Sequence, residues 1–195
     1  MGEKSLREKK TLPYTDLEPG RFAEYNDIEL NSLWIIPSRD RTGGHNADYH
    51  GNFVPQVAYQ LMRRYTRPGD VVIDWFLGGG TSAIEALRLG RRIIGVELKS
   101  DLVDQVASWL SPDALGERAQ LLAGDSTSSE TFAAVSRALE QWGLEKGHLA
   151  ILHPPYHNII RFSDDPRDLS NCPSVDVFLE TFGQVVDNAM RLLEE

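Results

Sequence analysis

The chain has 195 residues and a formal net charge of −9, which suits one globular domain and argues against an autonomous binder of polyanions. Its basic residues concentrate toward the N-terminus, so charge neither excludes nor establishes a nucleic-acid partner. The single cysteine, Cys172, excludes an internal disulfide framework and indicates a reducing compartment. No apolar run approaches the length of a membrane span, and residues 1–10 do not resemble a signal peptide. We therefore expect a cytoplasmic protein without a membrane partner.

Residues 1–30 are polar and are predicted to form an N-terminal arm or irregular lead-in before one domain over 31–195. The apolar run 33–36 ends at Pro37 and predicts a short buried strand. Glycine and asparagine residues predict a loop over 38–52.

From residue 54 onward, helical and strand patterns alternate. Helical spacing of apolar residues predicts helices over 54–65, 81–89, 101–110, 127–142 and 175–192. Runs of β-branched and other apolar residues predict strands over 71–73, 92–96, 120–123 and 149–152. Thr127 and Glu130 fit a capping box at the start of the fourth helix, and Trp109 and Trp142 are expected in the core.

This alternation is typical of an α/β fold with a doubly wound, mainly parallel sheet. Such a sheet usually has more strands than the four that the sequence predicts, and the helical pattern continues to the last residue. We therefore expect the sheet to be incomplete at the C-terminus, or to be completed by another chain.

A glycine turn, 74–81, joins the first strand of the regular part to the following helix. Gly78, Gly79 and Gly80 would let the backbone approach a ligand, and the N-terminus of the helix adds unpaired N–H groups. Gly78 and Gly80 also fit a dinucleotide fingerprint, and Glu97 ends the next strand, where a carboxylate suits ribose hydroxyls. These features alone fit NAD as well as S-adenosylmethionine.

Three further features favour S-adenosylmethionine. Asp74 is expected to face the ligand, where a carboxylate would repel the phosphates of NAD. Asp125 follows the third strand and suits the amino group of adenine. The third feature is the sequence His153-Pro154-Pro155-Tyr156, which follows the fourth strand at the same edge of the sheet.

These residues resemble the motifs of the amino-group DNA methyltransferases, which methylate the exocyclic nitrogen of adenine or cytosine. Segment 74–81 is similar to their F-x-G-x-G motif, and segment 153–156 is similar to their Pro-Pro-Tyr motif. Glu97 and Asp125 match the acidic positions between the two motifs, and segment 53–56 looks like the one that packs around the methionine part of the cofactor.

The resemblance implies a Rossmann-like methyltransferase domain over 31–195, with S-adenosylmethionine as cofactor, DNA as partner and no metal. The residues that it assigns to the cofactor are Phe53, Pro55, Asp74, Phe76, Gly78, Gly79, Gly80, Thr81, Glu97 and Asp125. Those that it assigns to catalysis are His153, Pro154, Pro155 and Tyr156. The side chain at 153 and the carbonyl of Pro154 would accept the N–H bonds of the base, and Tyr156 would stack on a base that has left the duplex.

The order of the motifs bears on DNA specificity. In the family, a glycine motif that precedes the Pro-Pro-Tyr motif places target recognition after the latter, where little chain remains. We expect recognition to come from a further segment, from another subunit or from the first 50 residues. The family has Asp, Asn or Ser where this chain has His153, so the target base stays open between adenine and cytosine.

Three other functions remain as alternatives: an RNA base methyltransferase, an inactive methyltransferase-like binding subunit, and, least favoured, an NAD-dependent oxidoreductase. Several polar residues are interpreted as structural. His45, Asp48 and His50 lack the further ligands of a metal site, and Cys172 has no adjacent histidine to activate it. The loop 157–173 is expected to be polar; its residues Asp164, Asp165 and Asp168 are interpreted as a solvated face, and His157 and Asn158 as loop residues.

Overall fold

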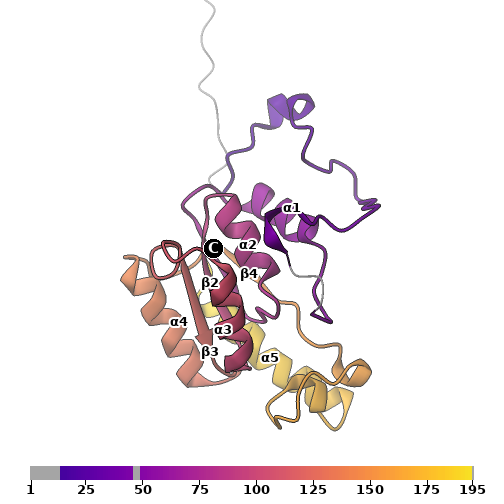
Figure 1. Ribbon diagram of the computed structural model, residues 1–195, viewed down its shortest axis with the longest axis vertical. Coiled ribbons are helices and arrows are strands. Elements are labelled where there is room, and N and C mark those ends of the chain that lie inside the picture. The colour runs from indigo at the N-terminus through magenta and orange to yellow at the C-terminus, as the bar shows by residue number, and fades with distance from the viewer. Residues whose placement is uncertain (1–13, 46–48, 195) are drawn as a thin grey trace, which may run out of the picture.

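A computed structural model describes residues 14–45 and 49–194 of the chain. The strands of its parallel sheet are β1 (Val71–Asp74), β2 (Arg92–Glu97), β3 (Ala119–Ala123) and β4 (Leu149–Ile151), in the order β3-β2-β1-β4. The α-helices are α1 (Pro55–Tyr65), α2 (Thr81–Arg88), α3 (Ser100–Trp109), α4 (Ser129–Gln141) and α5 (Val175–Arg191). The short 3-10 helices are η1 (Pro19–Glu24), η2 (Thr42–Gly44), η3 (His157–Ile159) and η4 (Leu169–Asn171). Figure 1 shows this arrangement, which confirms the predicted α/β, doubly wound class.

Helices cover both faces of the sheet because its strands are apolar on both sides. Val72 and Ile93 pack with residues of α1, α2 and α3, whereas their neighbours Val71 and Ile94 pack with residues of α4 and α5. Successive side chains of a strand point to opposite faces, so a continuous apolar run builds two cores.

The register brings the carboxyl ends of three strands together. Asp74 at the end of β1 pairs with Gly95 of β2 and with Ile151 of β4. The pairing continues past β1, where the N–H of Trp75 donates to the carbonyl of Ile151 (3.1 Å). The glycine turn and segment 153–156 therefore begin at adjacent positions on one edge of the sheet.

The start of α4 differs from the prediction. Ser128, not Thr127, is the N-cap, and its Oγ accepts a hydrogen bond from the N–H of Thr131 (3.1 Å). Thr127 instead donates through its N–H and its hydroxyl to Asp125. The predicted capping box of Thr127 and Glu130 is wrong because Asp125 provides a closer acceptor for Thr127.

The predicted strand over 33–36 is also wrong. This segment contains no strand, and Leu33 and Ile35 are 70% and 75% exposed. The sheet offers it no position, because the residues just before it, 27–29, pack on α1 through polar contacts. Gln60 of α1 accepts from the N–H of Glu29 (2.9 Å) and donates to the carbonyl of Asp27 (2.7 Å).

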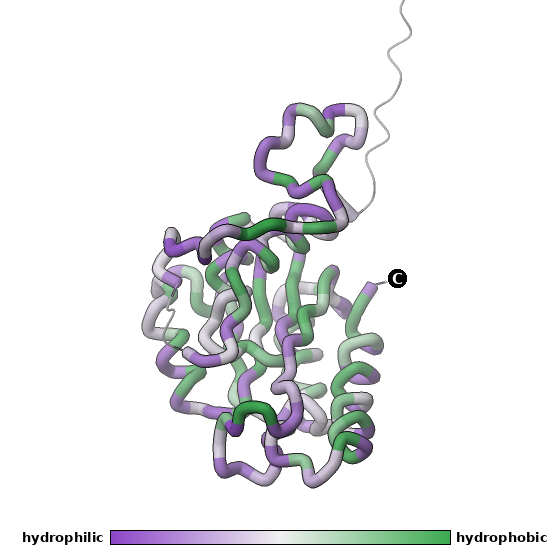
Figure 2. Tube along the Cα trace, turned by 90° about the vertical axis from the view of Figure 1, so that its right-hand side faces the viewer, coloured by the Kyte–Doolittle hydropathy of each residue, from purple (hydrophilic) through white to green (hydrophobic). Residues whose placement is uncertain are grey.

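The arm lies at the end of the sheet remote from the carboxyl edge. Thr15 contacts Arg63 in the last turn of α1 and Arg67 in the turn that leads to β1. Figure 1 places this indigo segment at the top of the view and the orange segment 157–173 at the bottom. Figure 2, turned by 90°, also shows the arm at the upper end of the molecule. Both Trp109 and Trp142 were expected in the core. Trp142 is partly buried and packs against the core cluster formed with α4 and α5, whereas Trp109 is 36% exposed at the end of α3.

Candidate active site

A cavity opens at the carboxyl edge of the sheet, between the glycine turn, the end of β2 and segment 153–156. The residues assigned from the sequence that line it are Phe53, Phe76, Gly78, Thr81, Glu97, His153, Pro154, Pro155 and Tyr156. The other assigned residues, Pro55, Asp74, Gly79, Gly80 and Asp125, lie around it without lining it. The structure thus brings residues of both motifs to one cavity.

Asp74 supports the turn from below instead of facing the cavity as expected. Its side chain is buried, and it accepts hydrogen bonds from the hydroxyl of Ser82 and from the N–H of Phe76 (2.9 Å). Burial is the main cause that raises the pKa of Asp74 to about 6, against an ordinary 3.8. A carboxylate enclosed in this way shapes the backbone of the turn.

The glycines of the turn have different surroundings. Gly78 lines the cavity, and its φ of 50° is in the left-handed region. A Cβ on Gly80, whose φ is 76°, would lie 2.6 Å from a methyl group of Val106 in α3. Gly80 therefore serves the packing of α2 against α3, and Gly78 provides the backbone that approaches a ligand.

Glu97 at the end of β2 is held by two backbone donors. Its carboxylate accepts from the N–H of Gly78 (3.0 Å) and from the N–H of Lys99 (3.0 Å). Burial raises the pKa of Glu97 above its ordinary value, and the two N–H groups oppose that rise. The result is a fixed, half-buried acceptor between the turn and the cavity.

Asp125 lies beside the cavity, but its side chain forms hydrogen bonds within the protein instead of lining the cavity. One of its carboxylate oxygens accepts from the N–H of Thr127 (2.9 Å) and from the Thr127 hydroxyl (2.8 Å). Its neighbours Gly124 and Ser126 line the cavity in its place. The hydroxyl of Ser126 donates to the carbonyl of Trp75 (2.6 Å), which connects the end of β3 to the glycine turn.

Segment 153–156 presents two aromatic rings to the cavity. Nε2 of His153 lies 3.0 Å from the hydroxyl of Tyr156, and Phe53 contacts the imidazole ring edge-on, with ring centroids 5.1 Å apart. Burial lowers the pKa of His153 below its ordinary value, which favours the neutral form of the ring. Tyr156 is 62% exposed, which leaves most of its ring accessible at the mouth of the cavity.

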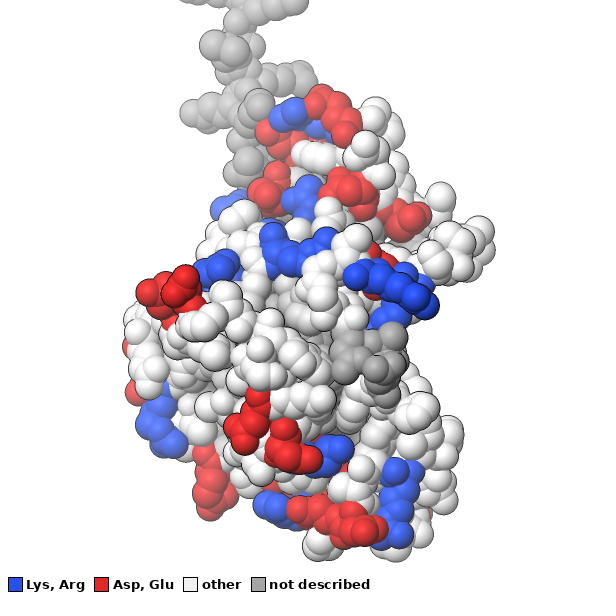
Figure 3. Space-filling view, viewed as in Figure 1, with Lys and Arg blue, Asp and Glu red and all other residues white. Residues whose placement is uncertain are grey.

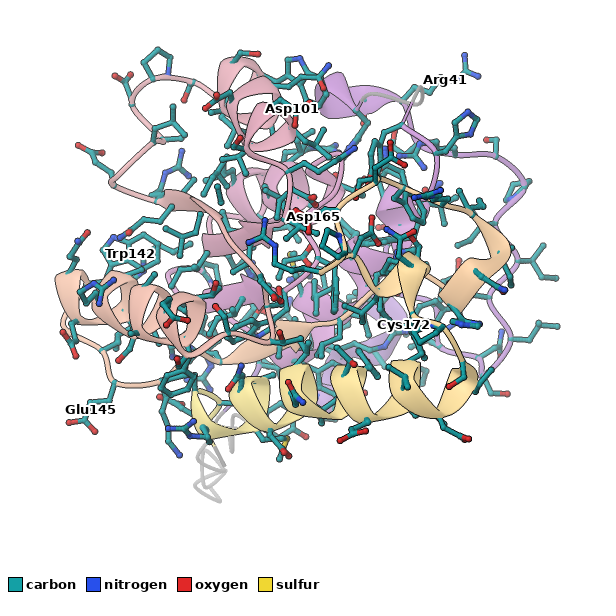
Figure 4. All side chains as sticks on the ribbon, turned by 90° about the horizontal axis from the view of Figure 1, so that it is seen from below. Arg41, Asp101, Trp142, Glu145, Asp165 and Cys172 are labelled. Carbon is teal, nitrogen blue, oxygen red and sulfur yellow. The ribbon has the colours of Figure 1, made fainter. Side chains whose placement is uncertain are left out.

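The segment after Tyr156 forms a further wall of the cavity. Figure 4 views the molecule from this end and shows Asp165 and Cys172 on the segment. His157 has a φ of 50°, unusual for a residue other than glycine, and its Nε2 lies 2.8 Å from the carbonyl of Cys172. Asp168, interpreted from the sequence as solvated, is buried and lines the cavity; that interpretation was wrong because Ser163 and Ser170 satisfy its carboxylate.

Sequence reasoning missed other residues of the cavity wall. Tyr49 lies between Lys99, whose Nζ is 5.6 Å from the tyrosine ring centroid, and Phe162, whose ring stacks on it. The residue Trp75 also lines the cavity, and its buried indole N–H has no hydrogen-bond partner among the described residues. These residues lie in loops, where the sequence has no periodic pattern. Their common position at the cavity wall is therefore seen only in the folded structure.

Other sequence interpretations concern a metal site and a membrane span. His45 is buried, and its Nε2 lies 2.7 Å from a carboxylate oxygen of Glu85 in α2. Asp48 lies outside the described residues. Within residues 14–45 and 49–194, no group of three or more His, Cys, Asp or Glu side chains is placed to hold a metal ion.

In the same part of the chain, none of the helices combines the length and apolarity needed to cross a bilayer.

Comparison with known proteins identifies relatives of this chain. The sequence model of a family described as DNA methylase matches residues 2–108, which include the glycine turn and Glu97 and precede segment 153–156. Type II methyltransferase M.BglI of Bacillus subtilis is 37% identical over 74 residues, covering 38% of this chain and 20% of that protein. Type II methyltransferase M.MjaII of Methanocaldococcus jannaschii is 34% identical over 50 residues, covering 26% of this chain and 9% of that protein. The matched region is thus a fifth or less of each relative's length.

A solved structure supports the fold. TrmN from Thermus thermophilus superposes with a TM-score of 0.53 at 19% identity, covering 74% of this chain and 36% of that one. Identity at this level bears on the fold alone. The family match, however, covers more than half of the sequence. The chain therefore belongs to the N6/N4 DNA methylase family.

Proposed function

We propose that this chain transfers a methyl group from S-adenosylmethionine to the exocyclic amino nitrogen of adenine or cytosine in DNA. One observation carries the proposal. The same cavity is lined by Gly78 of the glycine turn, by Glu97 between the two motifs, and by His153 and Tyr156 of the second motif. A cofactor and a base bound by these two groups of residues would be neighbours, as direct transfer requires.

The chemistry of the cavity fits the cofactor. Glu97 is a fixed carboxylate that can accept from ribose hydroxyls, and the backbone at Gly78 is free of a side chain. Trp75 carries a buried N–H that still needs an acceptor, and Val96 and Leu98 add apolar walls. When bound, S-adenosylmethionine supplies a methyl group attached to a positively charged sulfur.

The residues of segment 153–156 would hold the base. Two prolines fix the backbone dihedral angles and carry no N–H that could compete for the acceptors. The carbonyl of Pro154 and the imidazole of His153 are then the groups that accept from the amino group of the base. The accessible ring of Tyr156 offers a stacking surface to a base that has left the duplex.

The target base stays open between adenine and cytosine, since both present an exocyclic amino group. Thr15 of the arm contacts Arg63 and Arg67 at the other end of the sheet, so the proposal gives this part of the arm no contact with the base. We propose that residues other than these read the DNA sequence, in a further segment or in another subunit.

Two measurements test the proposal. Calorimetric titration with S-adenosylhomocysteine should show one binding site, and titration with NAD should show none. Transfer of labelled methyl from S-adenosylmethionine should then be measured on methyl-free duplex DNA and on structured RNA. Label on DNA supports the proposal, and label on RNA alone contradicts it. Cofactor binding without transfer to either, with candidate partner subunits supplied, would indicate a binding subunit.

A further inference from the structure

His153 and Tyr156 form a hydrogen-bonded pair inside one tetrapeptide. The distance between Nε2 of His153 and the Tyr156 hydroxyl is 3.0 Å, and the two rings are nearly perpendicular at 80°. Phe53, from the segment before α1, contacts the imidazole from another direction. The imidazole is therefore oriented by two neighbours, one polar and one apolar.

We infer that the Tyr156 hydroxyl positions His153 so that Nε2 carries the proton and Nδ1 is the acceptor for the amino group of the substrate. The inference deepens the proposed function and depends on it. It gives Tyr156 a task that phenylalanine or tryptophan, which could also stack on a base, cannot perform.

The argument follows from the proton positions of a neutral imidazole. One nitrogen carries hydrogen and the other accepts. The Tyr156 hydroxyl already occupies Nε2, and Nδ1 of His153 has no hydrogen-bond partner among the described residues. A substrate N–H can donate only to an imidazole nitrogen that carries no hydrogen. For Nδ1 to accept from the substrate, the hydrogen must therefore be on Nε2, which then donates to the tyrosine oxygen.

The surroundings of His153 keep the ring neutral. Burial alone lowers its pKa, and the charged side chains that line the same cavity, Glu97, Lys99, Arg167 and Asp168, do not contribute to that shift. Tyr156 is the titratable side chain in direct contact with the ring.

The pair also accounts for the proton released by the reaction. The lone pair of the amino nitrogen forms the bond to the methyl carbon, the carbon–sulfur bond breaks, and its electron pair stays on sulfur. The positive charge passes from sulfur to the nitrogen, which then loses a proton to Nδ1 of His153. The resulting imidazolium keeps its Nε2–H bond to the tyrosine oxygen, so this contact is the same before and after the step.

The test compares Tyr156→Phe, which removes only the hydroxyl, with Tyr65→Phe, which removes a tyrosine hydroxyl at the opposite end of the sheet. We expect Tyr156→Phe to lower kcat about tenfold with little change in KM, whereas Tyr65→Phe leaves both unchanged. In wild type, kcat should fall as the pH drops below the pKa of His153. In a His153→Asn variant, whose amide oxygen accepts without titrating, that acidic limb should disappear.

A double-mutant cycle separates positioning from a structural effect. If Tyr156 acts through His153, then Tyr156→Phe should change kcat by no more than about twofold in the His153→Asn background. A loss as large as in wild type would overturn the inference, because the hydroxyl would then act on something other than the imidazole.

Histidine nitrogen NMR provides a readout that needs no activity. The wild-type spectrum should show His153 protonated on Nε2, and Tyr156→Phe should change its tautomer population or its pKa. A wild-type His153 that carries its hydrogen on Nδ1, or a spectrum unaffected by Tyr156→Phe, would overturn the inference even in an active enzyme. Absence of methyl transfer by wild type would instead count against the proposed function.

Discussion

The carboxyl group of Asp74 is buried beneath the glycine turn, where burial raises its pKa to about 6 from 3.8. The folded chain therefore holds this proton more tightly than the unfolded chain, and this contribution to stability is lost as the pH rises from about 4 to about 6. At pH 7 the ionised group costs about 3 kcal/mol relative to an unperturbed carboxyl group.

Replacement of Asp74 by asparagine should remove this cost. The amide oxygen can accept from the N–H of Phe76, and the amide nitrogen can donate to Ser82, so both contacts survive. We expect Asp74→Asn to raise the free energy of unfolding by about 1–3 kcal/mol at pH 7 and to have little effect near pH 4. Urea unfolding at the two pH values measures this, with the exposed Asp164→Asn as control. An equal or lower stability at pH 7 would show that the ionised form is favoured.

Glu97 is the residue whose charge we expect to matter most for the cofactor. Glu97→Gln keeps an amide oxygen for the N–H of Gly78 or Lys99 but removes the negative charge. The dissociation constant of S-adenosylhomocysteine should rise by about 10- to 100-fold, because a charge-assisted hydrogen bond becomes a neutral one. Calorimetry against the exposed control Glu145→Gln checks it. An unchanged constant would mean that other residues hold the ribose.

At the scale of elements, Gly80 couples the start of α2 to α3. Alanine there would adopt a strained left-handed conformation and place its Cβ 2.6 Å from Val106. We expect Gly80→Ala to lower the free energy of unfolding by about 2–4 kcal/mol, the sum of backbone strain and overpacking. Gly183→Ala in the middle of α5, where a Cβ meets nothing within 4 Å, should instead stabilise the chain by about 0.5–1 kcal/mol. Thermal unfolding of both variants measures the contrast, and equal effects would refute this account of Gly80.

The elements also show which parts of the fold can be predicted from a single sequence. Strands β1 to β4 and helices α1 to α5 were predictable because their apolar residues repeat with a period that local geometry imposes. The run 33–36 has the same apolar pattern as the strands. It does not form a strand, because no strand of the sheet lies beside it to pair with. The choice of Ser128 over Thr127 as N-cap depended on Asp125, a competing acceptor that a capping pattern does not consider.

The cavity was predictable where its residues belong to motifs at strand ends, as for Glu97 and His153. Tyr49 and Asp168 could not be predicted, because each lies in a loop whose course depends on distant contacts. The hydrogen bond between His153 and Tyr156 was likewise invisible in the sequence, since it depends on side-chain directions. The roles assigned to these cavity residues remain predictions.

For the molecule as a whole, the N-terminal arm and the cavity lie at opposite ends of β1. Figure 3 shows Lys and Arg side chains gathered in a band where the arm meets the body. Basic residues of α1 also form ion pairs with the arm: Arg63 pairs with Asp16 (3.2 Å) and Asp27 (3.2 Å). The concentration of basic residues toward the N-terminus is thus partly used in internal ion pairs, and it does not identify a surface for DNA.

Ligand binding at the cavity should stabilise the whole fold, since it connects β1, β2 and β4 to the segment after β4. S-adenosylhomocysteine at 100 times its dissociation constant should raise the free energy of unfolding by about 2.7 kcal/mol. Thermal unfolding with S-adenosylhomocysteine or NAD at matched concentrations measures this directly. Stabilisation by NAD alone would favour an oxidoreductase over a methyltransferase.

β4 is the outermost strand of the described sheet on its side, and Gly147, just before it, pairs in parallel with Leu193. The backbone groups on the outer flank of an edge strand are a template for further pairing. Because the pairing at Leu193 is parallel, any polypeptide segment that extended it along this flank would run in the direction of β4, toward the carboxyl edge of the sheet.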